Sequence, residues 1–207
     1  MPSLPASTAT AVAATSSLAG TFNNHGITSD SSRSRGNFDG LGYSYSTEGL
    51  QTSGLTLGQT FGFNGFHFPL TNVVAGAFDD TAAQAQRVQL SHATGSSLAF
   101  LGAANNGPAS GAEVITYTDG TVQLYTLTFS DWTLNIGQAQ PSLGNTIAAT
   151  APYRNQRGGF SEGTRTYVFY DAVPLLPGKT LASVTLPRVS RLHVMSMAVG
   201  TPATAGQ

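Results

Sequence analysis

The chain alternates apolar and polar residues over many short segments, which is the pattern of β-strands with one buried face. The clearest pair is Gly111–Thr118 (GAEVITYT) and Thr121–Phe129 (TVQLYTLTF), which flank Asp119-Gly120. An Asp-Gly pair between two alternating runs is a strong signal for a tight turn between antiparallel strands. We therefore expect a β-hairpin here.

Further strand-like segments follow the same pattern, and each is bounded by Gly, Pro, Asn or Ser. They are Leu41–Ser46, Thr60–Phe63, Arg87–Ser91, Ser96–Leu101, Ile147–Ala151, Arg165–Ala172, Thr180–Leu186 and Arg191–Val199. Helical signal is scarce. Thr47–Leu50 and Asp79–Gln86 could each form a short helical turn, although neither carries an apolar stripe at helical spacing.

A second hairpin is indicated by four phenylalanines. Phe61 and Phe63 share one strand face, and Asn64-Gly65 then turns the chain toward Phe66 and Phe68. We expect these rings to belong to the core. Many short strands with turns between them, and no internal repeat, predict an all-β fold: a β-sandwich, with jelly-roll topology as the preferred arrangement.

The two ends of the chain differ in composition from the middle. Residues 1–17 (MPSLPASTATAVAATSS) contain no basic residue and no long apolar run, so they do not match a signal peptide. They resemble a Pro/Ser/Thr/Ala linker of a module cut from a longer exported protein, or an ordinary disordered terminus. Residues 201–207 form a similar tail. We therefore expect one β-sandwich module over residues 18–200.

Composition narrows the classes of partner. Charged residues make up 9% of the 207 residues, with 9 basic and 10 acidic side chains, and hydrophobic residues make up 40%. The basic residues are scattered, which argues against nucleic acid, and the chain lacks the long apolar run of a membrane helix. The absence of cysteine rules out thiol catalysis, disulfides and cysteine-based zinc sites. A surface rich in hydroxyls and amides suits neutral polar ligands.

Several strings along the chain carry a resemblance. They are FNNHGITSDSSRSRGNFDGLGYSYS (22–46), FSDW (129–132), APYRN (151–155) and KTLASVTLPRVSRLHVMSMAVG (179–200). In this order they resemble an accessory β-sandwich module of exported actinobacterial proteins, one appended to glycoside hydrolases. That module is similar to the galactose-binding-like jelly rolls, many of which bind carbohydrate. The resemblance covers residues 18–200 and implies an extracellular location.

Catalytic motifs are weak. Gly159–Gly163 (GFSEG) matches the G-x-S-x-G nucleophile elbow, but the strand before it and the helix after it, which that motif needs, are not indicated. A glycosidase needs two facing carboxylates, and the spacing selects no pair among Asp39, Asp131, Glu162 and Asp171. The four histidines have no metal-ligand spacing. An enzyme is therefore the less favoured interpretation.

Two aromatic groups are candidates for sugar binding. Trp132, the single tryptophan, follows Asp131 at the end of a long strand. It could be a stacking platform beside a carboxylate, or it could close the end of the sandwich while Asp131 accepts its N–H or a loop amide. Tyr43 and Tyr45 share one strand face. If that face is outward they form a platform, and if it is inward they are core residues.

Tyr153, Arg154 and Asn155 form the third candidate, where a strand meets a glycine-rich loop. A planar guanidinium and a carboxamide beside an aromatic ring can grip sugar hydroxyls. Alternatively Arg154 pairs with Asp131 or Asp39 and clamps two loops together.

A calcium ion is the one cofactor considered. Asp30, Asn37 and Asp39 lie close in sequence and offer the oxygen ligands that calcium prefers. Galactose-binding-like modules often carry a structural calcium near such a loop, so the resemblance also implies one. The alternative is that these residues only stabilise turns.

The sequence therefore predicts a secreted, non-catalytic module that weakly binds neutral polysaccharide or oligosaccharide beside the catalytic domain of its parent chain. Two alternatives remain open. The module could pack on that catalytic domain without touching sugar, which predicts an exposed apolar sheet face. It could also be a stand-alone glycoside hydrolase.

Overall fold

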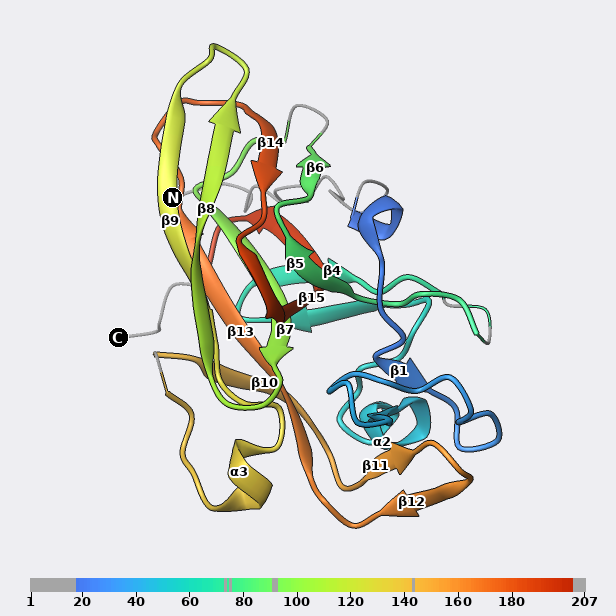
Figure 1. Cartoon of the computed structure of the whole chain (residues 1–207). Helices are drawn as coiled ribbons and strands as arrows, with labels where there is room; N and C mark the ends of the chain where they lie inside the picture. The colour runs from blue at the N-terminus through green and yellow to red at the C-terminus, as the bar shows by residue number, and fades with distance from the viewer. Residues whose placement is uncertain (1–17, 73, 75, 91–92, 143, 203–207) are drawn as a thin grey trace, which may run out of the picture.

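The protein is a β-sandwich, described here from a computed structural model that covers residues 18–72, 74, 76–90, 93–142 and 144–202. One layer is a five-stranded sheet in the order β10-β13-β7-β15-β5, and the other is a four-stranded sheet in the order β6-β14-β8-β9. Figure 1 shows the long β8–β9 hairpin along one side of the molecule. The predicted all-β sandwich is confirmed.

The strands of the first sheet are β5 (Thr81–Gln84), β7 (Ser97–Ala104), β10 (Thr146–Ala151), β13 (Thr166–Pro174) and β15 (Arg188–Gly200). Those of the second are β6 (Arg87–Gln89), β8 (Ala109–Tyr117), β9 (Val122–Phe129) and β14 (Leu181–Thr185). All pairs in both sheets are antiparallel. Most neighbours come from distant parts of the chain.

The predicted hairpins and most predicted strands are confirmed. β8 and β9 pair from Ala109↔Phe129 to Thr116↔Val122 around the Asp119-Gly120 turn. At that turn Lys179 forms an ion pair with Asp119. β3 (Thr60–Phe63) and β4 (Phe66–Pro69) form the second hairpin.

The β3–β4 hairpin packs on the five-stranded sheet through its aromatic rings. The centroids of Phe63 and Phe66 lie 5.4 and 5.9 Å from that of Tyr170 on β13. Phe61, Phe66 and Phe68 are buried. The turn between the strands has positive φ at Asn64 (49°) and Gly65 (80°), as the Asn-Gly pair favours.

One helical prediction is right and one is wrong. Thr47–Gln51 forms the short helix α2, whose N-terminus is capped by the Ser46 hydroxyl accepting from Gly49 N–H. The segment Asp79–Gln86 instead contains strand β5, which pairs with β15. Tertiary pairing overrides the weak local preference here because residues 79–83 are buried in the sandwich.

Smaller elements gather below one end of the sandwich (Figure 1). β1 (Ile27–Thr28), β2 (Tyr43–Ser46), β11 (Arg154–Gln156) and β12 (Phe160–Glu162) form a four-stranded sheet in the order β1-β2-β11-β12. The 3-10 turn η1 (Ala19–Thr21) precedes it in the chain, and α3 (Leu134–Gly137) lies at the same end. The GFSEG string therefore belongs to the β11–β12 hairpin and not to a strand–helix elbow.

A buried polar network ties this end to the main sheets. His193 on β15 is 2% exposed, and its Nδ1 lies 2.5 Å from the carboxylate of Asp80. Its Nε2 lies 2.9 Å from Nδ2 of Asn105, which also donates to the carbonyl of Phe38. Because the carboxamide nitrogen donates, Nε2 accepts, and the ring proton is on Nδ1 facing Asp80. The neighbouring Asp79 accepts from two backbone amides, and burial together with the charge of Asp80 raises its pKa.

The predicted linker (1–17) lies outside the described residues, as does most of the predicted tail (201–207). Within the described part of the chain, no helix has the length and apolar character needed to span a membrane.

Candidate functional site

Four of the predicted ligand-binding residues meet at one pocket. Tyr43, Asp131, Trp132 and Arg154 line a hollow of about 550 Å³ beside α3, which we call the end pocket. The exposed side chains of Leu41 and Ile136 also line it. Strand β9 delivers Asp131 and Trp132, and the paired strands β2 and β11 deliver Tyr43 and Arg154.

Trp132 is a core residue. Its side chain is 2% exposed, and its ring centroid lies 4.8 Å from that of Phe38 and 5.1 Å from that of Tyr45. The indole therefore closes the end of the sandwich, and its face is covered by aromatic rings. It does not offer an open stacking platform for a sugar.

Asp131 organises the loop that follows it. One carboxylate oxygen accepts from the N–H and hydroxyl of Thr133 (2.9 and 2.7 Å) and from the N–H of Asn135 (3.3 Å). The other accepts from the N–H of Gly107 at 2.8 Å. The carboxylate thus binds loop amides, one of the two roles expected for it.

The turn held by Asp131 is left-handed. Leu134, Asn135, Ile136 and Gly137 have φ values of 50°, 52°, 58° and 77°. Left-handed helical backbone is strained for residues other than glycine, by roughly 1–2 kcal/mol each, and β-branched residues are rare there. The α3 segment is therefore a strained turn at the edge of the end pocket.

Arg154 covers the face of Tyr43. Its guanidinium carbon lies 3.6 Å from the Tyr43 ring centroid, and its NH2 donates to both carboxylate oxygens of Glu162 at 3.0 and 3.2 Å. Burial alone would raise the pKa of Glu162, but the hydrogen bonds from Thr164 and Arg154 outweigh it and lower that pKa. The Arg154 Nε is buried and has no partner among the described residues. The polar groups of the end pocket are mostly used within the protein, and its open surface is apolar.

Tyr45, Tyr153 and Asn155 lie outside the end pocket. Tyr45 is fully buried, and its hydroxyl donates to the carbonyl of Tyr167 at 2.7 Å. Asn155 is fully buried and donates to the Thr28 carbonyl at 3.1 Å. The Tyr153 hydroxyl donates to Asp30 at 2.5 Å.

The three candidate calcium ligands make separate turn and loop contacts. Asp39 accepts from the N–H groups of Leu41 and Tyr43, and Asn37 accepts from the N–H of Gly42. Asp30 instead accepts from Ser46 and Tyr153. Burial would raise the pKa of Asp30, but these hydrogen bonds outweigh it and lower the pKa. Among the described residues no three Asp, Glu or His side chains gather as a metal site.

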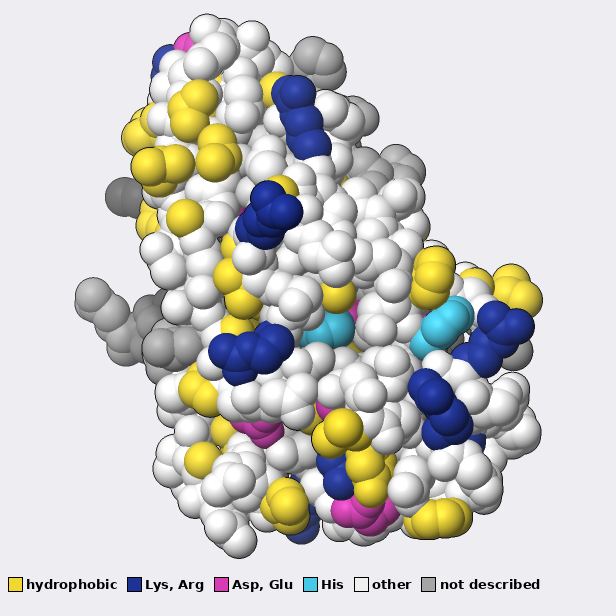
Figure 2. All heavy atoms as spheres, viewed as in Figure 1, with side chains coloured by type: hydrophobic (Ala, Val, Ile, Leu, Met, Phe, Trp, Pro, Cys, Tyr) yellow, Lys and Arg dark blue, Asp and Glu magenta, His cyan; other side chains and the backbone are white. Residues whose placement is uncertain are grey.

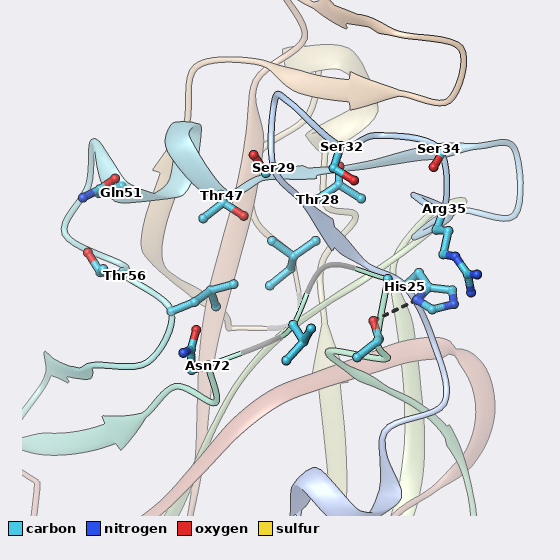
Figure 3. Close-up of a pocket in the computed structure, with 15 residues that line it drawn as sticks. His25, Thr28, Ser29, Ser32, Ser34, Arg35, Thr47, Gln51, Thr56 and Asn72 are labelled. Carbon is cyan, nitrogen blue, oxygen red and sulfur yellow. Dashed lines mark hydrogen bonds between the residues drawn. The ribbon is translucent and has the colours of Figure 1, made fainter.

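Sequence reasoning missed a second hollow, which we call the hydroxyl cavity (Figure 3). It measures about 300 Å³ and lies between the loop around β1, helix α2 and the segment that follows β4. Its lining comprises His25, Ile27, Thr28, Ser29, Ser32, Ser34, Arg35, Thr47, Gln51, Thr56, Leu57, Asn72, Val74, Gly76 and Ala77. In Figure 3 the labelled polar side chains surround the cavity from three sides.

Most polar side chains of the hydroxyl cavity are unused. Within the described part of the chain, seven of them make no side-chain hydrogen bond or ion pair: Ser32, Ser34, Arg35, Thr47, Gln51, Thr56 and Asn72. Apolar side chains of Ile27, Leu57 and Val74 lie between them. The sequence feature that points to this cavity is the run TSDSSRS (28–34), because it holds more hydroxyl side chains than a turn requires.

The loop that carries these residues is fixed from behind. Arg33 donates to Asn155 (3.0 Å), to the Gly159 carbonyl (2.9 Å) and to Ser161 (3.0 Å). Glu48 on α2 accepts from the Ser29 hydroxyl and from the Asp30 N–H. The loop therefore holds its position through protein contacts that leave the cavity side free.

Fold and cavities together define a β-sandwich domain with several hollows at one end. Its sequence matches the family model of the AziU2-like β-sandwich domain over residues 14–202. The chain therefore belongs to this family of β-sandwich domains. A comparison with curated proteins gave no match.

Proposed function

We propose that this domain is a non-catalytic binding module for sugars, and that the sugar occupies the hydroxyl cavity. The proposal depends on one observation: polar side chains with unused hydrogen-bonding groups surround a hollow that also has apolar walls. Sugar rings present hydroxyls at their edges and C–H groups on their faces, so this mixture is complementary to them. A volume of about 300 Å³ lies at the lower end of the range for small-molecule sites.

The end pocket supports this role less well. Its aromatic faces are covered, by Arg154 on Tyr43 and by Phe38 and Tyr45 on Trp132. Its carboxylate, Asp131, already accepts four hydrogen bonds. A sugar in this pocket would meet few free polar groups.

Catalysis is the least supported role. Glu162 is held by Arg154 and Thr164, and Asp131 by loop amides. Asp171 accepts from Tyr125 and Thr128. A carboxylate engaged in this way lacks the free, facing partner that glycoside hydrolysis needs.

A sugar-binding module would serve the larger protein that carries it. In an exported protein that also carries a glycoside hydrolase, the module would keep the enzyme near its polymer by weak binding. Charged side chains are sparse on its surface, as the 9% content of charged residues in the sequence implies (Figure 2).

Isothermal titration of the isolated chain with a panel of soluble oligosaccharides tests the proposal. Gln51→Ala combined with Asn72→Ala removes two free carboxamides from the cavity wall and should abolish measurable binding. Gln89→Ala, an exposed carboxamide on β6 outside the cavity, is the matched control and should bind as the wild type does. Leu41→Ser reports on the end pocket. Loss of binding only in Leu41→Ser, or no binding by the wild type, would contradict the proposal.

A specific surface favours one alternative, the packing domain. Val122 and Leu124 on β9 are 54% and 72% exposed, and Leu124 lies opposite the half-buried Val114 on β8. Figure 2 shows apolar side chains gathered over this part of the molecule. The hydrolase domain of a parent chain could cover this strip. If so, adding that domain should raise the melting temperature of the wild type but not that of Leu124→Lys.

A further inference from the structure

One end of the hydroxyl cavity carries positive charge. Arg35 and His25 lie side by side there, and Figure 3 shows both on the same flank, beside Ser34. None of the fifteen residues that line the cavity is acidic. The opposite flank, with Gln51, Thr56 and Asn72, carries only uncharged polar groups. The cavity is therefore polar along its length but cationic at one end.

Arg35 is free to bind a ligand, whereas its neighbour Arg33 is not. Arg33 makes three hydrogen bonds with the β11–β12 hairpin. The guanidinium of Arg35 makes no hydrogen bond or ion pair with any described residue, and the residue is exposed. Two arginines separated by one residue thus have different roles, because one anchors the loop and the other lines the cavity at its rim.

The surroundings hold Arg35 at this end. A Cβ atom on Gly76 would lie 3.2 Å from Cδ of Arg35, so the aliphatic stem of the arginine rests on the glycine backbone. Gly76 also has φ of 84°, a conformation that other residues adopt only with strain. A glycine at this point therefore allows the stem to approach the segment 74–77.

His25 is oriented by two contacts. Its Nδ1 lies 2.9 Å from the carbonyl oxygen of Ala77, so this nitrogen carries a proton and donates. Its ring packs against Phe78, with the centroids 4.6 Å apart. In the neutral ring the second nitrogen, Nε2, is an acceptor; it has no hydrogen-bond partner among the residues described and can accept from a hydroxyl of the ligand.

We infer that the hydroxyl cavity binds an acidic sugar whose carboxylate lies on Arg35, a ligand of the uronic-acid class. This inference rests on the proposed function and specifies its ligand. The planar fork of arginine matches the two oxygens of a carboxylate. The ring hydroxyls then face the free Ser, Thr and carboxamide groups further along. A phosphate would carry a second charge, and the lining holds no lysine and no second arginine to balance it.

Titration of the chain with three ligand types tests the inference: oligogalacturonate, the corresponding neutral galactose oligomer, and a hexose phosphate. The wild type should prefer oligogalacturonate to the neutral oligomer. Arg35→Gln should weaken oligogalacturonate binding by about tenfold or more, which is the range of a charge-assisted hydrogen bond, and leave the neutral oligomer unchanged. Arg35→Lys keeps the charge without the fork and should restore only part of the preference.

Arg188→Gln is the matched control, since it removes an equally exposed charge outside the cavity and should bind as the wild type does. Equal binding of acidic and neutral oligomers by the wild type would overturn the acidic-sugar inference and leave the proposed function standing. Preference for the hexose phosphate would overturn the choice of carboxylate. Failure of all three ligands to bind would overturn both proposals. Because Arg35 has no partner in the described fold, a melting curve of Arg35→Gln should match that of the wild type.

Discussion

Glu113 lies directly opposite Tyr125 across the β8–β9 pair, yet the Tyr125 hydroxyl donates to Asp171 at 2.8 Å and not to Glu113. Both carboxylate oxygens of Glu113 are buried and have no partner in the described part of the structure. Burial, together with the charge of Asp171, raises the pKa of Glu113 to about 8. An ionisable group thus lies in the sandwich interior without a bond to stabilise its charge.

Replacing Glu113 by Gln should stabilise the protein increasingly as the pH rises. The pKa of this carboxyl rises from its ordinary 4.5 in the unfolded chain to about 8 in the folded one. Between these values the folded state binds the extra proton, so the free energy of unfolding falls as the pH rises. At pH values above the folded pKa, the wild type has lost on the order of 5 kcal/mol of its free energy of unfolding. The variant has no titrating group at this position and does not lose it.

Urea unfolding of both proteins at a series of pH values measures this difference. Gln89→Ala, which replaces an exposed uncharged side chain on β6, is the control and should follow the wild type in its pH dependence. Parallel curves for the wild type and Glu113→Gln would show that the Glu113 carboxyl finds a partner or water in the folded state.

Trp132→Ala should destabilise the domain rather than act on binding alone. The indole is buried against Phe38 and Tyr45, and removing a buried aromatic side chain costs about 3–5 kcal/mol. Chemical denaturation monitored by circular dichroism gives this value. Trp132→Phe should lose less because part of the ring contact remains. A loss below about 1 kcal/mol for the alanine variant would contradict the buried position.

Ile136→Gly should raise stability, although most substitutions lower it. Ile136 is 65% exposed and has φ of 58°, so it contributes little burial and bears left-handed strain. Relief of that strain, roughly 1–2 kcal/mol, exceeds the entropy that glycine adds to the unfolded chain, about 0.4–1 kcal/mol. Differential scanning calorimetry should show a higher melting temperature. Val74→Gly, at an exposed site without positive φ, should show no such rise.

His193→Ala should be strongly destabilising because it leaves the Asp80 carboxylate buried without its imidazole partner. Breaking one side of a buried pair costs about 3–5 kcal/mol. The two residues should also show coupling in a double-mutant cycle. Asp80→Asn combined with His193→Ala should cost less than the sum of the single changes. If the two changes in unfolding free energy are strictly additive, Asn24, which also donates to Asp80, stabilises the buried carboxylate without help from His193.

Local sequence patterns predicted the hairpins well because the residues that form a tight turn are adjacent in the sequence. Thr60–Phe63 has the predicted bounds, Asn64-Gly65 forms the two-residue turn between β3 and β4, and Asp119-Gly120 lies in the turn between β8 and β9. The helical prediction for Asp79–Gln86 failed because the conformation of this segment depends on its burial in the sandwich. Its acids contact backbone and side-chain donors from other segments, among them Gly26 and His193, and such contacts have no local signature.

The candidate site was predicted only in part for a similar reason. Tyr43, Asp131, Trp132 and Arg154 do converge on one pocket, which their positions beside strand ends suggested. Whether an aromatic face is open depends on what covers it, and the cover on Tyr43 comes from a residue 111 positions later, Arg154. The hydroxyl cavity joins residues from three parts of the chain, within 25–35, within 47–57, and at 72, 74, 76 and 77, so no single stretch of sequence could reveal it.

The ion pair between Lys179 and Asp119 has a practical consequence. Lys179 is the only lysine in the sequence, and from the connection between β13 and β14 it contacts the tip of the β8–β9 hairpin, at the other end of the molecule from β1 and α2. Once the α-amino group of the chain is blocked, reagents that couple to amines attach at this single side chain. A surface or fluorophore linked there leaves the hydroxyl cavity facing outward, so the blocked domain can be immobilised in one orientation.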